Sequence, residues 1–500
     1  MLTGVSGPRR VLCGAMVAFG LTGTAAWAQY SATPEATATA TPAATPAPTP
    51  KPPAPTPMAP QPVMPAFKLP IRELNLSAEV RHRYEYWKDF DFNKANKDTD
   101  DVIGQRIRLG LEFVPTETLK GFIQIQDARA FGNASIYPLN GIPVPTAGTG
   151  NNTLASQGAS TDVHQAYFLA NHKKTGLSIQ IGRQEWLYGT QKVIGPVGWS
   201  NVGRAFDGVR LRYDKTFATT DVLWSRLSEG GRTRGTPPVA TVDWVDADFY
   251  GVYSTVKLVK SHPFDLYWLG LGDDEITGLE GKTGNTNFNT FGFQLSKIQG
   301  KNVQIEYGTE LNYQTGHRSG TDHSAYAVHA RLGVGSPKWP LQAKLLYQYD
   351  LASGDTNRAD GESETFQQLF PTVHLWHGYI DLVARQNVQD HWLALYTVPK
   401  KDWRLGFHFH LLSPAEGTDA LYRANGAAIR VPAAGTNGGT EFGKELNVIL
   451  DKKMNANWNI QAGFGQFMTG DYLANVPVTG GTAAPHDDVT YFYLQSTVAF

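Results

Sequence analysis

Apolar and polar residues alternate along one short segment after another, from about residue 72 to Phe500. The clearest segment runs from Ile103 to Phe113. Its apolar members share one face: Ile103, Ile107, Leu109, Leu111 and Phe113. The other face holds Gly104, Arg106, Arg108 and Glu112. Because successive side chains of a strand point to opposite sides, this period of two predicts β-strands with one apolar and one polar face.

The same pattern predicts about eighteen strands, an even count of the kind that bacterial outer-membrane barrels use. In such a barrel the apolar face contacts lipid and the polar face lines a wet interior, whereas in a soluble sandwich the apolar face would form the core. We expect the strands near 74–88, 103–113, 119–128, 162–171, 177–186, 205–213, 217–228, 247–258, 264–271, 289–298, 302–314, 323–334, 341–351, 390–398, 402–412, 440–450, 457–468 and 489–500.

The connections between these segments alternate strictly between short and long. Short connections include 114–117, 214–216, 299–301 and 399–401. The long ones are 129–161, 187–204, 229–246, 272–288, 352–389, 413–439 and 469–488. Outer-membrane barrels have short periplasmic turns and long extracellular loops, and a soluble sandwich has no reason to collect its long loops at one end. We therefore predict an all-β fold, an antiparallel transmembrane outer-membrane β-barrel spanning residues 71–500.

The C-terminal segment supports this prediction. Phe492, Leu494, Val498 and the terminal Phe500 alternate with polar and aromatic residues, and a closing strand that ends on an aromatic residue is the expected assembly signal of outer-membrane barrels. Tryptophans near strand ends suit the aromatic girdles at the two membrane interfaces. The girdle candidates are Trp87, Trp186, Trp224, Trp392 and Trp403.

The N-terminus predicts export from the cytoplasm. Arg9 and Arg10 precede an apolar stretch that ends in Ala26-Trp27-Ala28, so we expect residues 1–28 to be a signal peptide cleaved after Ala28. Residues 29–70 are rich in Pro, Ala and Thr and predict a disordered periplasmic linker, with contact to a periplasmic partner as a minor alternative. The only cysteine, Cys13, would leave with the signal peptide.

Several function classes lack support. The net charge is −1 and no basic block stands out, which argues against nucleic-acid binding. We find no nucleophile elbow and no zinc-protease motif, and expect neither an enzyme nor a cofactor. The pairs His374 with His377 and His408 with His410 have no evident third metal ligand. Acidic residues at 355–364 permit a calcium site, although a solvated loop is the better interpretation.

The inward faces predicted by alternation are rich in arginine. Arginine binds carboxylates with two parallel hydrogen bonds and keeps its charge, which suits a path for polyuronates. Carboxylates on the same faces, such as Glu79, Glu112, Asp221 and Glu306, leave open that the arginines form structural ion-pair ladders across the lumen. The candidate path residues are Arg81, Arg83, Arg106, Arg108, Arg210, Arg212, Arg331 and Arg404.

Two long motifs resemble the bacterial alginate export family. The first runs from Gly182-Arg183-Gln184-Glu185-Trp186 to Arg204-Ala205-Phe206-Asp207-Gly208. The second runs from Ser353-Gly354-Asp355-Thr356-Asn357 through His374 to Asp381 and Gln386-Asn387. The resemblance covers about residues 70 to 500, and implies an eighteen-stranded monomeric barrel with an arginine-rich lumen. Motif residues expected at a rim or constriction are Arg183, Gln184, Arg204, Asp207, Asp355, Asn357, His374 and Asp381.

Three functions remain open from the sequence. The first is an outer-membrane channel that exports an anionic, alginate-like polysaccharide through the arginine-lined lumen. The second is a general or substrate-specific uptake porin for sugars or small organic anions. The third is an outer-membrane enzyme or adhesion scaffold. The partners expected for a channel are outer-membrane lipid and an anionic polysaccharide or small anionic solute.

Overall fold

The computed structural model describes residues 71–93, 99–132, 159–227, 247–277, 283–477 and 486–500. The predicted signal peptide, with its cleavage after Ala28, and the predicted linker 29–70 lie outside these residues and stay predictions.

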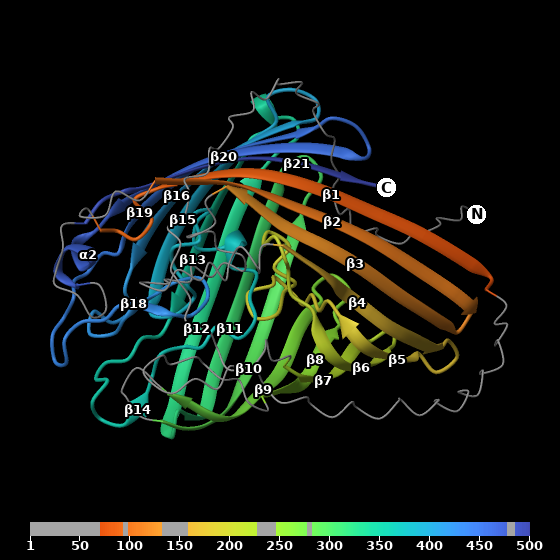
Figure 1. The fold of residues 1–500 in the computed structure, drawn as a ribbon, viewed down its shortest axis with the longest axis horizontal. Helices are drawn as coiled ribbons and strands as arrows, with labels where there is room; N and C mark the ends of the chain where they lie inside the picture. Colours follow the sequence, from red (N-terminus) through yellow and green to blue (C-terminus); the bar gives the residue numbers. More distant parts are fainter. Residues whose placement is uncertain (1–70, 94–98, 133–158, 228–246, 278–282, 478–485) are drawn as a thin grey trace, which may run out of the picture. The chain divides into compact units, whose positions relative to one another are not determined.

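The wall of the molecule is one antiparallel sheet whose strands follow each other in sequence order (Figure 1). Its strands are β1 (Glu73–Lys88), β2 (Thr99–Thr116), β3 (Leu119–Gly132), β4 (Ala159–His172), β5 (Leu177–Gln184), β6 (Phe206–Asp214), β7 (Ala218–Arg226), β8 (Asp248–Val256), β9 (Phe264–Thr277), β10 (Thr283–Gln299), β11 (Gln304–Arg318), β12 (Thr321–Gly335), β13 (Lys344–Ala352), β15 (Val388–Thr397), β16 (Trp403–Ser413), β19 (Gly443–Lys453), β20 (Trp458–Thr469) and β21 (Val489–Ala499).

Small elements decorate this wall. The two-residue strand β14 (Glu362–Ser363) pairs in parallel with β12 and brings the sheet to 19 strands. The others are the hairpin β17 (Leu421–Tyr422) and β18 (Ala428–Arg430), the 3-10 turns η1 (Pro340–Gln342) and η2 (Val373–Leu375), and the helix α2 (Asp471–Asn475). Among the described residues, no helix has the length and apolarity needed to cross a bilayer.

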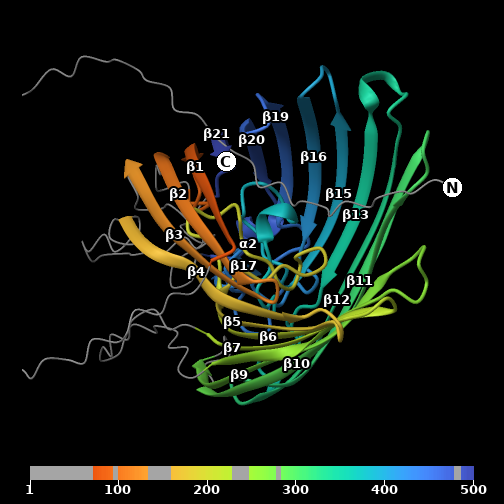
Figure 2. The same ribbon diagram turned by 90° about the vertical axis from the view of Figure 1, so that its right-hand side faces the viewer.

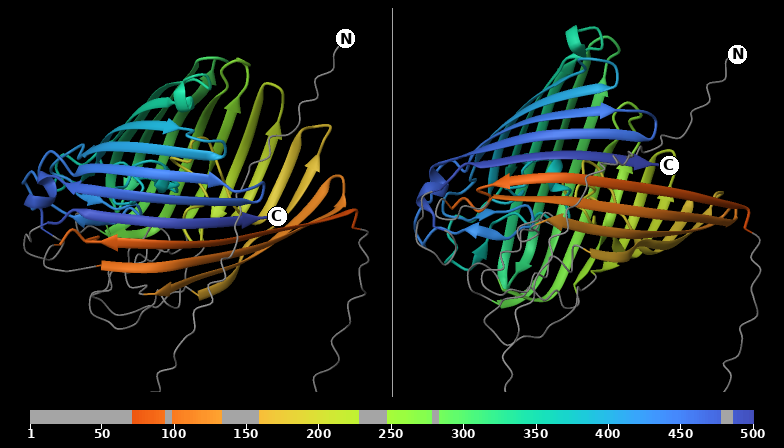
Figure 3. Two further views of the ribbon diagram at one scale, coloured as in Figure 1. Left: turned by 90° about the horizontal axis from the view of Figure 1, so that it is seen from above. Right: turned by 45° about the horizontal axis from the view of Figure 1, so that its top comes forward.

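The sheet closes on itself where the first and last strands meet, as Figure 3 shows. Strand β1 pairs antiparallel with β21 from Glu79 opposite Ala499 to Lys88 opposite Thr490. The backbone N–H of Phe500 donates to the carbonyl of Ala78 at 3.0 Å, and Ala78 donates back to Phe500 at 2.8 Å. Closure removes the unpaired strand edges, which a lipid environment does not tolerate. The predicted closed antiparallel barrel is confirmed.

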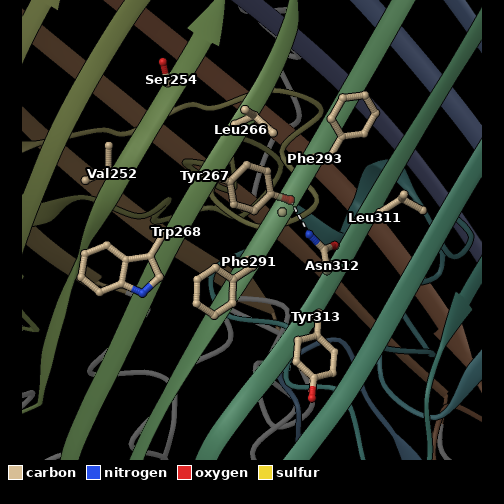
Figure 4. A pocket seen from close by; sticks show the side chains of 11 residues that line it. Val252, Ser254, Leu266, Tyr267, Trp268, Phe291, Phe293, Leu311, Asn312 and Tyr313 are labelled. Carbon is tan, nitrogen blue, oxygen red and sulfur yellow. Dashed lines mark hydrogen bonds between the residues drawn. The ribbon is translucent and has the colours of Figure 1, made fainter.

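Alternation places apolar side chains outside and polar ones inside. On β2, Leu109 is 57% exposed, while its neighbour Arg108 on the inner face is 8% exposed. Figure 4 shows the outer face over β8 to β11, where Trp268, Phe291 and Tyr313 line a hollow in the apolar surface. A surface that presents aromatic and aliphatic groups in this density is suited to lipid acyl chains.

The long connections within the described residues gather at one end of the barrel, and one connection is shorter than predicted. We expected a long loop at 272–288, but β9 and β10 extend to Thr277 and Thr283 and leave only 278–282. Strands β11 and β12 are joined by residues 319–320. The polar stretch 283–290 pairs with β9, with one register shift between Gly284 and Thr286, although it lacks apolar alternation. The predicted strict alternation of short and long connections was therefore wrong here.

Three of the five girdle candidates point inward, which corrects the prediction for Trp87, Trp186 and Trp392. Trp87 has the same parity along β1 as the inward Arg83, so it lies on the inner face. Trp186 follows the end of β5, where the alternation no longer applies. Trp224 is exposed on the outer face of β7, as a girdle residue should be.

Two of the long connections fold into the barrel, where Figure 2 shows them inside the ring of strands. We name them the first inner loop (185–205) and the second inner loop (353–387). They meet in a short parallel pairing, in which Phe370 donates to the carbonyl of Val193 at 2.9 Å and accepts from Gly195 at 2.8 Å. The lumen is therefore occupied by chain on the side of the long connections and is lined by these loops as well as by strands.

Candidate functional site in the barrel lumen

The eight arginines predicted for the lumen lie on the inner faces of their strands. They fall into one group of four on the adjacent strands β1 and β2 and into separate positions on β6, β12 and β16. The group of four, Arg81, Arg83, Arg106 and Arg108, is called the arginine wall below. Arg81 lies directly opposite Arg106 in the strand register. Like charges placed opposite each other repel, so this arrangement requires anionic or carbonyl ligands.

Backbone carbonyls of the first inner loop supply ligands for the arginine wall. Arg81 donates to the carbonyls of Gly198 and Ser200, both at 2.9 Å. Arg106 donates to the same two oxygens, at 3.1 and 2.9 Å. Arg83 donates to the carbonyl of Trp199 at 2.7 Å. Two guanidinium groups thus converge on each of two carbonyl oxygens, and the loop is held against the wall.

Carboxylates also pair with the arginine wall. Glu79 accepts from Arg106 at 2.7 Å, and Glu85 lies 2.8 Å from Arg83. Glu185 at the start of the first inner loop lies 3.2 Å from Arg108 and 2.7 Å from the Nε2 atom of His164. Part of the arginine wall therefore forms the ion-pair ladder that the sequence left open. The contacts with the loop carbonyls were not predicted from the alternation.

Trp199 connects the arginine wall to both inner loops. The Arg83 guanidinium lies 3.9 Å from the centre of the Trp199 ring on one side. The His374 imidazole stacks on the same indole ring, with the two ring centres 3.7 Å apart and an interplanar angle of 4°. The Nδ1–H group of His374 donates to the Asp381 carboxylate at 2.9 Å. Two predicted motif residues, His374 and Asp381, therefore act together in holding the second inner loop against the first.

The remaining predicted arginines have local partners. Arg212 forms a two-point pair with Asp221, both contacts at 2.7 Å, and Arg331 contacts Glu306 at 2.9 Å. Arg210 donates to the side-chain oxygen of Gln180. Arg404 is exposed at the start of β16, near the short-turn end of the barrel. The structure does not bring these four together with the arginine wall.

A second charged cluster joins both inner loops to the strands. Lys192 contacts Asp350 at 2.5 Å, and Asp350 also contacts Arg385 at 3.1 Å and His329 at 2.8 Å. Glu310 accepts from Thr190 at 2.6 Å. Burial lowers the pKa of Lys192 to about 8, and the Asp350 carboxylate opposes that shift. Lys192 and Arg385 were missed by the sequence analysis because loop residues follow no period, although both fall within the two motif regions.

The residues of the first motif stabilise the two ends of the first inner loop, where it joins β5 and β6. Gln184 is fully buried and donates to the carbonyls of Gly182 and Gly208, both at 3.2 Å. Arg204 donates to the carbonyl of Gly195 at 3.2 Å and to that of Pro371 at 3.1 Å, so it bridges the two inner loops. Arg183 and Asp207 face each other on β5 and β6, 3.8 Å apart.

Asp355 and Asn357 shape the start of the second inner loop. The two carboxylate oxygens of Asp355 accept backbone N–H groups from Asn357 at 3.0 Å and Glu364 at 3.4 Å. The side chain of Asn357 accepts from the N–H of Ala359 at 3.3 Å. These contacts support a structural role for the acidic stretch. Within the described part of the chain, no group of histidine, cysteine, aspartate or glutamate has the arrangement of a metal site.

Histidines on β16 line the wall beneath the second inner loop. His410 contacts Asp390 at 2.9 Å, and His377 contacts the same carboxylate at 3.4 Å. His408 packs against the Trp392 ring at 5.1 Å. The histidine pairs singled out in the sequence therefore lie close together, as part of the lining on which the loop rests.

The chain matches the family model described as alginate export over residues 72–484. The chain belongs to the alginate export family. The match covers the whole barrel except its final strand, and the predicted family and fold are confirmed. Members of this family are outer-membrane barrels, so the protein is an outer-membrane channel.

Solved structures with the same fold are outer-membrane barrels of low sequence identity. Acinetobacter baumannii OccAB4 aligns with a TM-score of 0.55 at 10% identity, over 87% of this chain and 100% of that one. Pseudomonas aeruginosa OccK5 (OpdH) aligns at 0.55 and 11% identity, over 86% and 99%. Pseudomonas aeruginosa OpdK, solved with vanillate, aligns at 0.53 and 10% identity, over 85% and 99%. Comparison with curated protein sequences found no match.

Proposed function

We propose that this alginate export family member exports an anionic, alginate-like polysaccharide through its arginine-lined lumen. The observation that carries the proposal is the arginine wall, four inward arginines on two adjacent strands. Each guanidinium offers a planar pair of donors that matches a carboxylate, and none loses its charge at physiological pH. Arg210, Arg212, Arg331 and Arg404 would extend the path toward the short-turn end.

Successive weak sites suit the movement of a long chain. A polyuronate presents one carboxylate per sugar, so it can exchange one arginine for the next without dissociating from all of them at once. Conduction requires binding that is strong enough to attract the cargo and weak enough to release it. Some of the arginines are already paired with Glu79, Glu85 and Asp221. This pairing lowers their affinity for the carboxylates of the cargo and so favours its release.

Uptake of small organic anions is the second candidate. One observation favours it: a barrel of the same fold, Pseudomonas aeruginosa OpdK, was solved with vanillate, which is a small aromatic carboxylate. The inner loops also occupy much of the lumen, which suits a small solute. We assign the protein no catalytic role and propose that it works as a monomer. The Pro-rich segment 29–70 would serve as a periplasmic spacer or contact a periplasmic partner.

A planar-bilayer recording of the full chain tests the cargo class. A trimer of galacturonate should reduce the current reversibly, and neutral maltotriose at the same concentration should not. Arg106→Gln combined with Arg108→Gln should weaken the block, while Lys215→Gln in an exposed turn should leave it unchanged. Equal sensitivity to the charged and the neutral trimer would count against a polyuronate path.

A further inference from the structure

We propose that residues 197–203, the docked segment, occupy the carboxylate sites of the arginine wall, and that a uronate carboxylate opens the path by displacing them. When no cargo is present, the loop carbonyls would bind the arginines that otherwise bind the carboxylates of the cargo. This inference rests on the proposed function and adds to it the contact through which the cargo would regulate its own passage.

The geometry of the wall supports this exchange. Arg81 and Arg106 both point at the carbonyl oxygens of Gly198 and Ser200, with all four distances between 2.9 and 3.1 Å. The two carbonyl oxygens engage guanidinium N–H groups that would otherwise be available to the oxygens of a carboxylate. The Trp199 carbonyl likewise accepts a hydrogen bond from the Arg83 guanidinium group at 2.7 Å.

A carboxylate is a stronger ligand for these arginines than a peptide carbonyl. An arginine bond to a carbonyl has one charged partner, whereas a carboxylate adds the attraction of an opposite charge and can accept two parallel hydrogen bonds from one guanidinium group. The carbonyls bring no charge to a wall in which Arg81 and Arg106 lie directly opposite each other. A bound uronate would reduce that repulsion. The docked segment therefore seals the wall in the absence of anions and yields to them.

The backbone of the docked segment is under strain while it is docked. Val197 has a φ of 49°, a left-handed conformation in which a β-branched side chain is a genuine outlier. Gly203, at the other end, has a φ of 78°. A residue forced into such a conformation persists only where surrounding contacts hold it. The Val197 N–H donates to the Thr372 hydroxyl at 3.2 Å, while the arginines hold the next three residues, so release from the arginines would remove one of the two sets of contacts that keep the segment in this conformation.

The part of the first inner loop that precedes the docked segment has different supports. Lys192 is ion-paired with Asp350, and Val193 and Gly195 are hydrogen-bonded to Phe370. These contacts involve no residue of the arginine wall. The docked segment can therefore leave the wall while residues 188–196 remain attached to the second inner loop and to β13. Its departure would also break the bonds from the Asn201 amide to the backbone carbonyls of Gln105 and Arg129, both at 3.0 Å.

Cysteine labelling of the full chain in lipid vesicles tests the exchange. Ser200 is buried, and a Ser200→Cys variant in a Cys13→Ser background carries a single thiol that is hidden while the segment is docked. We expect trigalacturonate to raise the labelling rate by a water-soluble maleimide about tenfold, the change that one charge-assisted hydrogen bond accounts for. Maltotriose at matched ionic strength should leave the rate unchanged.

Two control thiols define the range of labelling. Ser225→Cys lies buried in the wall on β7 and should stay unlabelled in every condition, whereas Ser261→Cys lies exposed in a turn and should label fully in every condition. Adding Arg81→Gln and Arg106→Gln to Ser200→Cys should raise labelling without any anion and abolish the response. Arg226→Gln, at an arginine that pairs with Asp248 at 3.0 Å and lies outside the proposed path, is the matched arginine control and should preserve the response.

The outcomes separate this inference from the proposed function. If trigalacturonate blocks the current but leaves labelling of Ser200→Cys unchanged, the exchange is refuted and the anion channel stands. If trigalacturonate affects neither current nor labelling, both proposals fail. A rise in labelling with maltotriose as well would show that the segment moves without regard to charge, and would overturn the exchange.

Discussion

Lys192 carries an ammonium group that is completely buried inside the barrel, with its side chain at 0% exposure. Two features make this burial tolerable: the Asp350 carboxylate at 2.5 Å and the Trp376 ring 3.6 Å from Nζ. Arg385 shares the same carboxylate, and its positive charge disfavours the buried ammonium. Removing one partner of a buried ion pair is costly because it leaves the other charge buried without its counterion. The stability of the inner loops is thus concentrated in a few residues.

Lys192→Met should destabilise the protein by about 3 kcal/mol, near the lower end for a broken buried pair, because Asp350 keeps Arg385 and His329 as partners. The free energy of unfolding is measured by denaturant titration of protein inserted in vesicles. Lys173→Met, which removes an exposed pair with Glu117 on the turn side, is the control and should cause no measurable change. Equal losses for the two variants would contradict the importance assigned to the buried pair.

At the scale of elements, the strands were predictable and the inner loops were not. Strand β2 extends over Thr99–Thr116 around the predicted 103–113, because an alternating pattern fixes both the strand and its inner face. Where the alternation stops, as at Trp186, the sequence no longer indicates direction, and the contact of Trp199 with His374 joins residues far apart in the chain. The arginines were therefore placed on the correct face while their loop ligands were missed.

Strand packing depends on glycine at one inner position. A Cβ atom on Gly292 of β10 would lie 2.0 Å from the ring of Tyr267, which donates to Glu310 at 2.9 Å. Gly292→Ala should therefore displace the ring and cost about 2 kcal/mol of stability, a typical penalty for overpacking. Gly272→Ala on β9, where a Cβ would meet nothing within 4 Å, is the matched control. An unchanged unfolding midpoint for Gly292→Ala would contradict the packing argument.

At the scale of the whole molecule, closure of the barrel depends on the pairing of β1 with β21. Phe500 forms two backbone hydrogen bonds with Ala78 there, while its side chain is 71% exposed. The exposed ring contributes little to packing. We predict that the ring instead takes part in recognition during assembly in the outer membrane.

Phe500→Ser should therefore reduce the amount of protein inserted in cells several-fold and leave refolding of the purified protein into vesicles nearly unchanged, because the backbone hydrogen bonds persist. Heat-modifiable migration of folded barrel on gels measures both quantities. Phe492→Ser, on the lipid-facing side of the same strand, serves as the comparison and should impair refolding as well. A Phe500→Ser protein that fails equally in both assays would assign the residue to stability.

The most direct test of the central claim, an anion path through an arginine-lined lumen, is the reversal potential of the full chain in a planar bilayer under a potassium chloride gradient. We expect a reversal potential with the sign of an anion-selective channel. Arg210→Gln and Arg212→Gln, on the inner face of β6, should each shift this potential toward zero. A potential of the sign set by potassium, or one that ignores both substitutions, would contradict this claim.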